Sequence, residues 1–187
     1  MQEDIKKALE ILKNGGVILY PTDTVWGLGC DATNEDAVLK IYGIKKRIDS
    51  KSMLILVDHS GRIAPYVKEV PEIAWELIDA AVSPITIIYP GAKNLAKNLI
   101  AEDGSVGIRI PDDDFCCELI KKFGKPIVSS SANISGEKFP ATFSEISEEI
   151  KESVDYIVKW RQDDMTKKAP SSIIKLGEGG LFKIIRE

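Results

Sequence analysis

The chain has 187 residues, of which 44% are hydrophobic, so it is long enough to bury a core within one compact domain. It carries 25 Lys and Arg against 29 Asp and Glu, a formal net charge of −4. This mild acidity is not typical of a nucleic-acid-binding surface and confines any anion site to a local patch. No apolar run reaches the roughly 18 residues of a membrane helix, and the charged start lacks a signal-peptide core, so we expect a cytoplasmic protein.

Three cysteines are an odd number, which argues against a framework of disulfides. Cys116 and Cys117 are adjacent and Cys30 lies far away in the sequence, so the paired spacing of a zinc site is missing as well. We expect three reduced thiols, as is usual in the cytoplasm, and no metal site built from protein side chains. The acids of "PDDD" are expected to cap a helix instead.

Apolar residues recur at helical spacing in several segments, and recognisable start and stop signals bound them. Gly15 and Gly16 end the first segment, Thr33 or Asn34 caps the second, and Gly124 ends the fourth. Thr142 and Glu145 have capping-box spacing at the start of the last. The helices expected in chain order lie at 5–12, 34–46, 71–81, 112–123 and 142–150.

Continuous apolar runs between these segments read as buried strands. The strands expected in chain order lie at 17–20, 52–57, 85–89, 106–110, 126–130, 155–158, 171–176 and 181–185. Helices that alternate with strands predict a three-layer α/β domain, classed as α+β in some schemes. Strand candidates cluster near the carboxyl end, which favours a twisted, mixed sheet flanked by helices. No linker or repeat interrupts the pattern, so we expect a single domain over 1–187.

Polar side chains cluster where the predicted strands end. "PTDT" follows the first strand, "SSSAN" follows "PIV", and Arg109 lies near the end of "VGIRI". Ligands bind at strand ends in such sheets, and this mixture of hydroxyl, amide and guanidinium groups suits a zwitterion or a nucleotide. The alternative is that Ser129, Ser131 and Asn133 only satisfy the backbone of a turn. Composition alone gives the two interpretations about even weight.

A basic cluster, "IKKRIDSK", stands at the end of the second predicted helix. Lys45, Arg47 and Lys51 there would suit a phosphate clamp, in which Arg supplies a planar fork and Lys a point charge. Solvated cations at a helix carboxyl end are the competing interpretation. Spacing alone does not decide between them.

The order of the motifs resembles one known family. "PTDTVWGLGCDA", "IKKR", "GSVGIRIP", "PIVSSSANISG" and "PSSII" follow one another as in the YrdC-like family, the threonylcarbamoyl-AMP synthases. The resemblance runs from about Gly15 to Arg186, nearly the whole chain. It implies a YrdC-like fold without the extra carboxyl-terminal domain of longer relatives.

The resemblance also implies an activity, that of an ATP-dependent nucleotidyltransferase. Members join L-threonine, bicarbonate and ATP into threonylcarbamoyl-AMP and release pyrophosphate, for threonylcarbamoyl modification of the adenosine beside the tRNA anticodon. The implied cofactor is Mg²⁺ held through the triphosphate of the substrate ATP. The implied partners are the enzymes that transfer the group to tRNA, with weak binding of RNA or tRNA itself.

Site residues follow from the same motifs, position by position. The catalytic set of the family, K-x-R and S-x-N, corresponds to Lys45, Arg47, Ser131 and Asn133. The implied ATP contacts are Arg47, Lys51, Ser105, Ser131, Asn133 and Arg186. The implied threonine contacts are Thr24, Arg109, Ser129 and Ser172, with Arg109 pairing with the carboxylate.

Two alternatives stay open, because the chain departs from the family pattern at several positions. The common W-P-G-P-L-T run is reduced to "AVSPIT", and Ile48 and Ser52 stand where prolines are usual. These departures favour a YciO-type paralogue with the same fold and weak or no synthase activity. An RNA-binding module without chemistry is the other alternative, and the net charge disfavours it.

Overall fold

The computed structural model describes residues 1–46, 53–177 and 181–187. Within them, strands contribute to one mixed sheet: β1 (Ile18–Tyr20), β2 (Gly27–Gly29), β3 (Leu54–Leu56), β4 (Ile85–Tyr89), β5 (Val106–Arg109), β6 (Ile127–Ser131), β7 (Tyr156–Ile157), β8 (Ser172–Leu176) and β9 (Phe182–Arg186). Their order across the sheet is β7-β1-β2-β6-β3-β5-β4-β8-β9. The pairs β1–β7, β3–β5 and β4–β8 are parallel, and the other neighbours are antiparallel, as expected for a mixed sheet.

Helices cover both faces of this sheet. They are α1 (Gln2–Lys13), α2 (Glu35–Ile44), α3 (Glu72–Ala80), α4 (Asp114–Phe123) and α5 (Glu148–Glu152), with 3₁₀ turns η1 (Ser60–Arg62), η2 (Ala64–Tyr66), η3 (Lys97–Leu99) and η4 (Phe143–Glu145). The Asn34 side chain caps α2 by accepting from the Ala37 amide, as the sequence predicts. Asp113 caps α4 in the same way, and Gly124 ends it with a left-handed φ of 78°.

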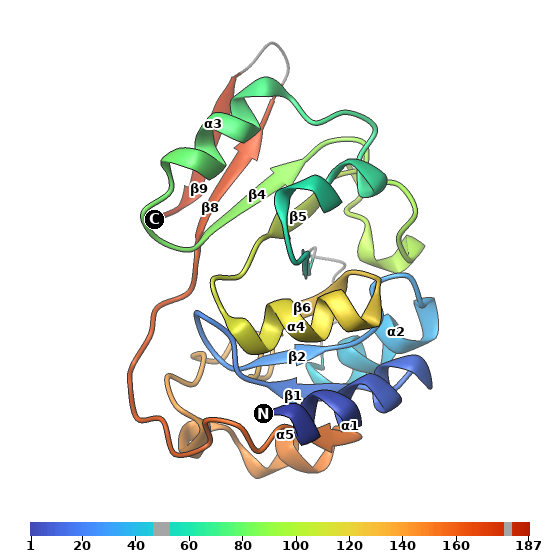
Figure 1. The fold of residues 1–187 in the computed structure, drawn as a ribbon, viewed down its shortest axis with the longest axis vertical. Coiled ribbons are helices and arrows are strands. Elements are labelled where there is room, and N and C mark those ends of the chain that lie inside the picture. Colours follow the sequence, from blue (N-terminus) through green and yellow to red (C-terminus); the bar gives the residue numbers. More distant parts are fainter. Residues whose placement is uncertain (47–52, 178–180) are drawn as a thin grey trace.

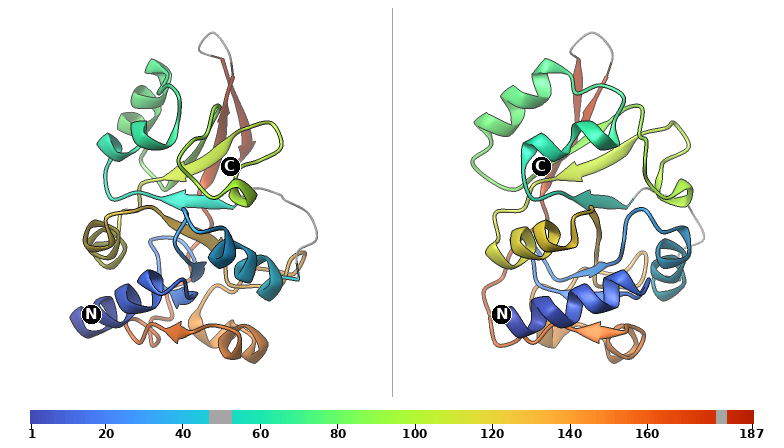
Figure 2. Two further views of the ribbon diagram at one scale, coloured as in Figure 1. Left: turned by 90° about the vertical axis from the view of Figure 1, so that its right-hand side faces the viewer. Right: turned by 45° about the vertical axis from the view of Figure 1, so that its right-hand side comes forward.

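The core has one cluster on each face of the sheet. Helices α1 and α4 lie side by side and cover one face at β1, β2 and β6, around Tyr20, Leu56 and Phe115 (Figure 1). The larger cluster, on the other face, includes residues of α2, α3 and α5 together with Ile87 and Ile108. The sheet twists strongly, so β8 and β9 run across the direction of β1 and β2 (Figures 1 and 2).

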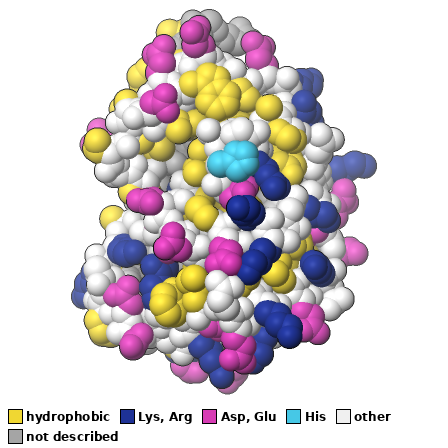
Figure 3. Space-filling view, in the orientation of Figure 1, with side chains coloured by type: hydrophobic (Ala, Val, Ile, Leu, Met, Phe, Trp, Pro, Cys, Tyr) yellow, Lys and Arg dark blue, Asp and Glu magenta, His cyan; other side chains and the backbone are white. Residues whose placement is uncertain are grey.

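The face of the molecule shown in Figure 3 does not carry one dominant charge. On this face, acidic and basic side chains are interspersed, and hydrophobic side chains gather toward the end where α3 lies. This mixture agrees with the small net charge of −4. Within the part of the chain that the structure describes, no helix has the length and apolar character needed to cross a membrane.

One local expectation is wrong, and one strand has no counterpart among the expected elements. The segment 142–150 is not one helix, because Glu145 turns back to accept from the Ala141 amide and the chain makes only the turn η4 there. The Ser147 hydroxyl, accepting from the Ile150 amide, caps the later helix α5. The second difference is β2, whose two glycines flank Leu28 and lack the side chains that normally indicate a strand.

The three cysteines are free thiols with different exposure, and this gives a labelling prediction. Cys30 and Cys116 are buried, and burial raises the pKa of both thiols. The half-buried Cys117 also has a raised pKa, for the same reason. With an alkylating reagent at pH 8, we expect Cys117 to react first and the other two only after unfolding. Peptide mass mapping checks the order, and early labelling of Cys30 in folded protein would contradict this packing.

Candidate functional site

Strand pairing sets a row of side chains on one face of the sheet. Ser129 of β6 is paired with Leu54 of β3, and Leu56, two residues further on, is paired with Arg109 of β5. Arg109 is in turn paired with Thr86 of β4. Directly paired residues point to the same face, so these side chains project together although they come from four strands.

The row continues onto the last two strands. Thr86 is paired with Ile173 of β8, and Ile173 is paired with Arg186 of β9. The register between β8 and β9 shifts just after this pair, between Ile173 and Ile174. A bulge of this kind re-aims a side chain, and here it lets Arg186 share the face of Ile173.

A cavity of about 260 Å³ lies over this row. Its walls come from six strands and the loops that join them: Thr24, Val25, Gly27, Met53, Leu54, Arg109, Ser129, Ser130, Ser131, Phe139, Pro170, Ser171, Ile173 and Arg186. Gly27 lies beside the Ser129 hydroxyl, from which an added Cβ would stand 3.4 Å away, an ordinary contact distance. Hydroxyls, guanidinium groups and apolar side chains therefore line this cavity together.

Arg109 is the main charge of the cavity. Its Nη1 donates to Oδ1 of Asp23, and the two side chains are only 2% and 5% exposed. The second Asp23 oxygen accepts from the Asp112 amide at 3.3 Å. Nε of Arg109 is buried and has no partner among the described residues. A buried guanidinium with an unused donor is a costly arrangement that an anionic ligand would relieve.

Arg186 supplies a second guanidinium. Its Nε and Nη2 donate to the Ser171 carbonyl at 3.0 and 2.6 Å. Partial burial, and then the positive charge of Arg109, lower the pKa of Arg186. The two guanidinium groups are close enough to repel each other, and only Arg109 is paired with a carboxylate, that of Asp23. The cavity is therefore attractive to a carboxylate or a phosphate.

The hydroxyls of the cavity are held in place by short hydrogen bonds. Thr24 and Thr22 share a bond of 3.0 Å between their Oγ1 atoms, and Thr22 also donates to the Val25 carbonyl at 2.8 Å. On the far side, Ser171 and Thr86 share a bond of 2.7 Å. All four side chains are buried, so their orientations are fixed before any ligand arrives.

Lys45 lies behind the cavity wall. It follows the last residue of α2, is only 3% exposed, and its Nζ donates to the carbonyls of Ser131 and Asn133 at 2.5 and 2.7 Å. The backbone carbonyl of Lys45 accepts from the Ser135 amide at 2.9 Å. The lysine thus joins the helix to the turn after β6 and fixes the shape of that turn.

Asn133 stands on the turn that Lys45 holds. Its Nδ2 donates to the carbonyls of Ile134 and Glu137 at 2.9 and 2.8 Å. Its Oδ1 is buried and has no partner among the described residues. This oxygen is therefore an acceptor available to a donor group of a ligand.

The structure brings together most of the side chains predicted from the sequence, but not all of them. Thr24, Arg109, Ser129, Ser131 and Arg186 line the cavity, and Lys45 and Asn133 lie just outside its lining. The predicted ATP contacts Arg47 and Lys51 lie outside the described residues.

Two predicted residues lie away from the others. Ser172 is paired with Ile85 and so points to the opposite face of the sheet, whereas its neighbour Ser171 lines the cavity. Ser105 precedes β5 at the end opposite Arg109, and its hydroxyl donates to Asp103 at 2.6 Å. Which of the two serines faces the cavity follows from the alternation of side chains along β8. That alternation depends on how β8 is aligned with β4, and the sequence alone does not specify this register.

Sequence reasoning missed Asp23, the acid within "PTDT". Its ion pair with Arg109 joins the loop after β1 to the end of β5, across 86 positions of sequence. The available signal was an acidic residue between two threonines in a motif that follows a buried strand. A buried arginine elsewhere in the same protein requires a negatively charged partner, and this acid could supply it.

Comparison with known proteins gives the chain a family. A family model described as Sua5/yciO/yrdC, Telomere recombination, matches residues 10–187. The threonylcarbamoyl-AMP synthase of Pseudoalteromonas translucida is 32% identical over 185 residues, 97% of this chain and 98% of that protein. A putative threonylcarbamoyl-AMP synthase of Methanocaldococcus jannaschii is 36% identical over 188 residues, 98% of this chain and 87% of that protein.

Solved structures agree with this result. P. abyssi Sua5 complexed with L-threonine matches 92% of this chain with a TM-score of 0.82 at 26% identity, and the match covers 50% of the Sua5 chain. E. coli YciO matches 100% of this chain with a TM-score of 0.86 at 25% identity, and the match covers 90% of YciO. The chain thus spans about half of the Sua5 structure and most of YciO.

The motif order, the mixed sheet and these matches lead to one conclusion, that the chain belongs to the Sua5/YciO/YrdC family.

Proposed function

We propose that this protein is a threonylcarbamoyl-AMP synthase, a nucleotidyltransferase that uses L-threonine, bicarbonate and ATP and releases pyrophosphate. The observation that carries the proposal is the cavity around Arg109, whose buried guanidinium has an unused donor beside fixed hydroxyls. The names of relatives that match almost the whole chain support it. The product would serve the enzymes that modify tRNA.

At the threonine end of the cavity, Arg109 binds the carboxylate in this proposal. Its Nε, free of other partners in the described chain, and a second guanidinium nitrogen form the fork that a carboxylate fits. Thr24 and Ser129 line the same space and are buried, so they are suited to the ammonium and hydroxyl groups of threonine. The complex of the Sua5 relative with L-threonine supports this choice of ligand.

At the nucleotide end, Ser131 and Asn133 are the proposed contacts. Lys45 acts as a positioning residue, because its ammonium is engaged by the two carbonyls of this turn. Arg186 adds positive charge on the opposite wall. Arg47 and Lys51 remain predicted triphosphate contacts, on sequence grounds only.

The chemistry we propose needs alignment more than a strong base. The neutral threonine nitrogen forms a bond to the carbon of carbon dioxide and loses a proton, or to the carbon of bicarbonate with loss of water, and either route gives a carbamate. A carbamate oxygen then bonds to the α-phosphorus of ATP while the bond to pyrophosphate breaks. Holding two anions side by side and neutralising their charge supplies most of the catalysis in such a displacement.

Mg²⁺ enters the proposal as a partner of the triphosphate. Within residues 1–46, 53–177 and 181–187, no three His, Cys, Asp or Glu side chains gather where they would hold a metal ion. Mg²⁺ commonly binds through phosphate oxygens and water with few protein ligands, and this arrangement fits the residues present. When bound, it would supply neutralisation of the leaving pyrophosphate.

The activity is tested by release of pyrophosphate from ATP, Mg²⁺ and bicarbonate, with and without L-threonine. We expect pyrophosphate release that depends on threonine. The same protein preparation without added bicarbonate measures the slow background release. Folded protein that binds ATP but releases no pyrophosphate under any condition would contradict the proposal.

A YciO-type paralogue with weak or no synthase activity is the second candidate. The specific observation that favours this candidate is the match to E. coli YciO, which covers 100% of this chain. The two candidates differ in what the Arg109 cavity binds. A threonine-dependent assay decides between them, whereas the fold does not.

The adjacent serines of "PSSII" give a matched pair of variants. Ser171 lines the cavity and shares a 2.7 Å bond with Thr86, whereas Ser172 points to the other face of the sheet. We expect Ser171→Ala to raise the KM for threonine or ATP by about 5- to 10-fold, the effect of about one hydrogen bond. Ser172→Ala should leave both constants within about 2-fold. Steady-state kinetics checks the pair, and equal effects would contradict this placement.

A further inference from the structure

A second cavity lies on the other face of the sheet and is separate from the proposed active site. It has a volume of about 580 Å³ between α3 and strands β4 and β5. Its walls include Ile87 and Ile108, which alternate with Thr86 and Arg109 and so point away from the Arg109 cavity. None of the functions described above uses this space.

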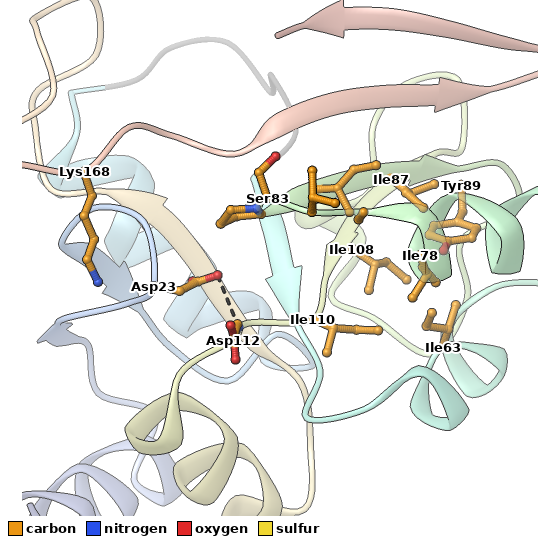
Figure 4. Close-up of a pocket in the computed structure, with 14 residues that line it drawn as sticks. Asp23, Ile63, Ile78, Ser83, Ile87, Tyr89, Ile108, Ile110, Asp112 and Lys168 are labelled. Atoms are coloured by element: carbon orange, nitrogen blue, oxygen red, sulfur yellow. Dashed lines mark hydrogen bonds between the residues drawn. The ribbon is translucent and has the colours of Figure 1, made fainter.

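The cavity is apolar at one end and charged at the other. Figure 4 shows Ile63, Ile78 and Tyr89 gathered with Ile87 and Ile108 at the apolar end. Three charged side chains, Asp112, Asp23 and Lys168, lie at the other end, with Lys168 on the far side of Asp23 from the isoleucines (Figure 4).

The three charges are not equally engaged. Asp23 is paired with Arg109, and its other oxygen accepts from the Asp112 amide. The side chains of Asp112 and Lys168 form no hydrogen bond or ion pair with any residue in the described ranges. Asp112 therefore has no side-chain partner in the described chain, and Lys168 has only a longer-range charge attraction to Asp164. Both flank a carboxylate that can still accept another donor.

We propose that this cavity binds an α-amino acid with a large apolar side chain. The ligand ammonium would pair with Asp112 and Asp23, and the ligand carboxylate with Lys168. The side chain would enter the space lined by isoleucines, whose burial supplies the affinity. Threonine is a poor ligand here, because its small side chain would bury little apolar surface against the isoleucines.

Asp23 connects this second site with the Arg109 cavity. A ligand ammonium beside Asp23 offsets the negative charge that opposes an anion at Arg109, so the apolar amino acid should tighten binding of a carboxylate on the other face. Linkage requires the effect to be reciprocal, and we expect a factor of about five. The predicted coupling between the two sites rests on the proposed function, whereas binding of the apolar amino acid in the second cavity does not.

Three probes that share one aromatic body test the site: L-phenylalanine, phenethylamine without the carboxylate, and 3-phenylpropionate without the ammonium. Methyl NMR of isoleucine-labelled protein, without ATP or threonine, follows Ile87 and Ile108. We expect the chemical shifts of these methyl groups to change and to saturate as each probe is added, with L-phenylalanine binding most tightly. Equal affinities for the three probes, or no saturable shift, would overturn the proposal.

Two crossed variants assign the charges. Asp112→Asn should weaken L-phenylalanine and phenethylamine by about 3- to 5-fold and leave 3-phenylpropionate unchanged, because the partly exposed pair is screened by water. Lys168→Met should weaken L-phenylalanine and 3-phenylpropionate instead. Asp114→Asn removes the same charge outside the cavity and should change nothing. Loss of all three probes in either variant would contradict the assignment.

The coupling is measured last, as the Kd for threonine with and without saturating L-phenylalanine. A Kd lowered about five-fold supports the link through Asp23. An unchanged Kd, with phenylalanine bound, overturns the link but not the site. If threonine does not bind at all, the proposed function fails, and the two failures are distinguished.

Discussion

Arg109→Ala should lower kcat/KM for L-threonine by about 100-fold or more. Arg109 pairs with Asp23 and keeps its Nε for a ligand, so alanine removes the proposed carboxylate partner and leaves a buried acid without its counter-charge. Truncating one side of a buried charge pair costs about 2–5 kcal/mol, and each 1.4 kcal/mol is about tenfold. Threonine-dependent pyrophosphate release, measured over a range of threonine concentrations, checks this value.

Two controls separate this effect from loss of the fold. Arg109→Lys keeps a positive charge for Asp23 but lacks the planar fork, so it should stay folded and still lose threonine activity by about tenfold or more. The Kd for ATP should change little in either folded variant, because Arg109 lies at the threonine end. Wild-type activity in Arg109→Lys would contradict the bidentate contact.

Lys45→Met should destabilise the protein by about 2–4 kcal/mol. The buried ammonium donates to the carbonyls of Ser131 and Asn133, and methionine fills a similar volume but leaves both carbonyls unsatisfied. Hydrogen bonds to a charged group contribute about 1.5–3 kcal/mol, and an orphaned buried acceptor costs about 1–3 kcal/mol. For a chain of this length, the thermal midpoint should fall by roughly 10 °C.

The neighbouring lysine is the matched control. Lys46 forms a 2.6 Å ion pair with Glu149, but the two side chains are 61% and 53% exposed. Exposed pairs of this kind contribute little, so Lys46→Met should change stability by less than about 1 kcal/mol. Denaturant unfolding of both variants gives the comparison. A similar loss of stability in both variants would show that Lys45 does not hold the turn after β6.

Much of the candidate site was predictable from the sequence, because short motifs fix local chemistry. Arg109, Ser129 and Ser131 stand at strand ends in the sequence pattern, and the sheet brings them to one cavity. The mixed sheet was also predictable, since strand candidates cluster near the carboxyl end. Apolar runs and helix caps such as Asn34 depend on neighbouring residues alone.

The remaining features depend on contacts between distant segments. The choice of Ser171 over Ser172 follows from the register of β8 against β4, and the position of Arg186 follows from a bulge. The pairing of Asp23 with Arg109 needs the loop after β1 to meet the end of β5. The apolar cavity under α3 is a property of packing, and no motif indicates it.

The most direct test of the account is the product itself. Protein incubated with ATP, Mg²⁺, L-threonine and carbon-13 bicarbonate should give a nucleotide with the mass of threonylcarbamoyl-AMP that carries the label, and Arg109→Lys should give little or none. Labelled product would establish the reaction and the carboxylate contact together. Wild-type protein that is folded, binds ATP and gives no labelled adenylate would contradict the synthase proposal and favour the YciO-type paralogue.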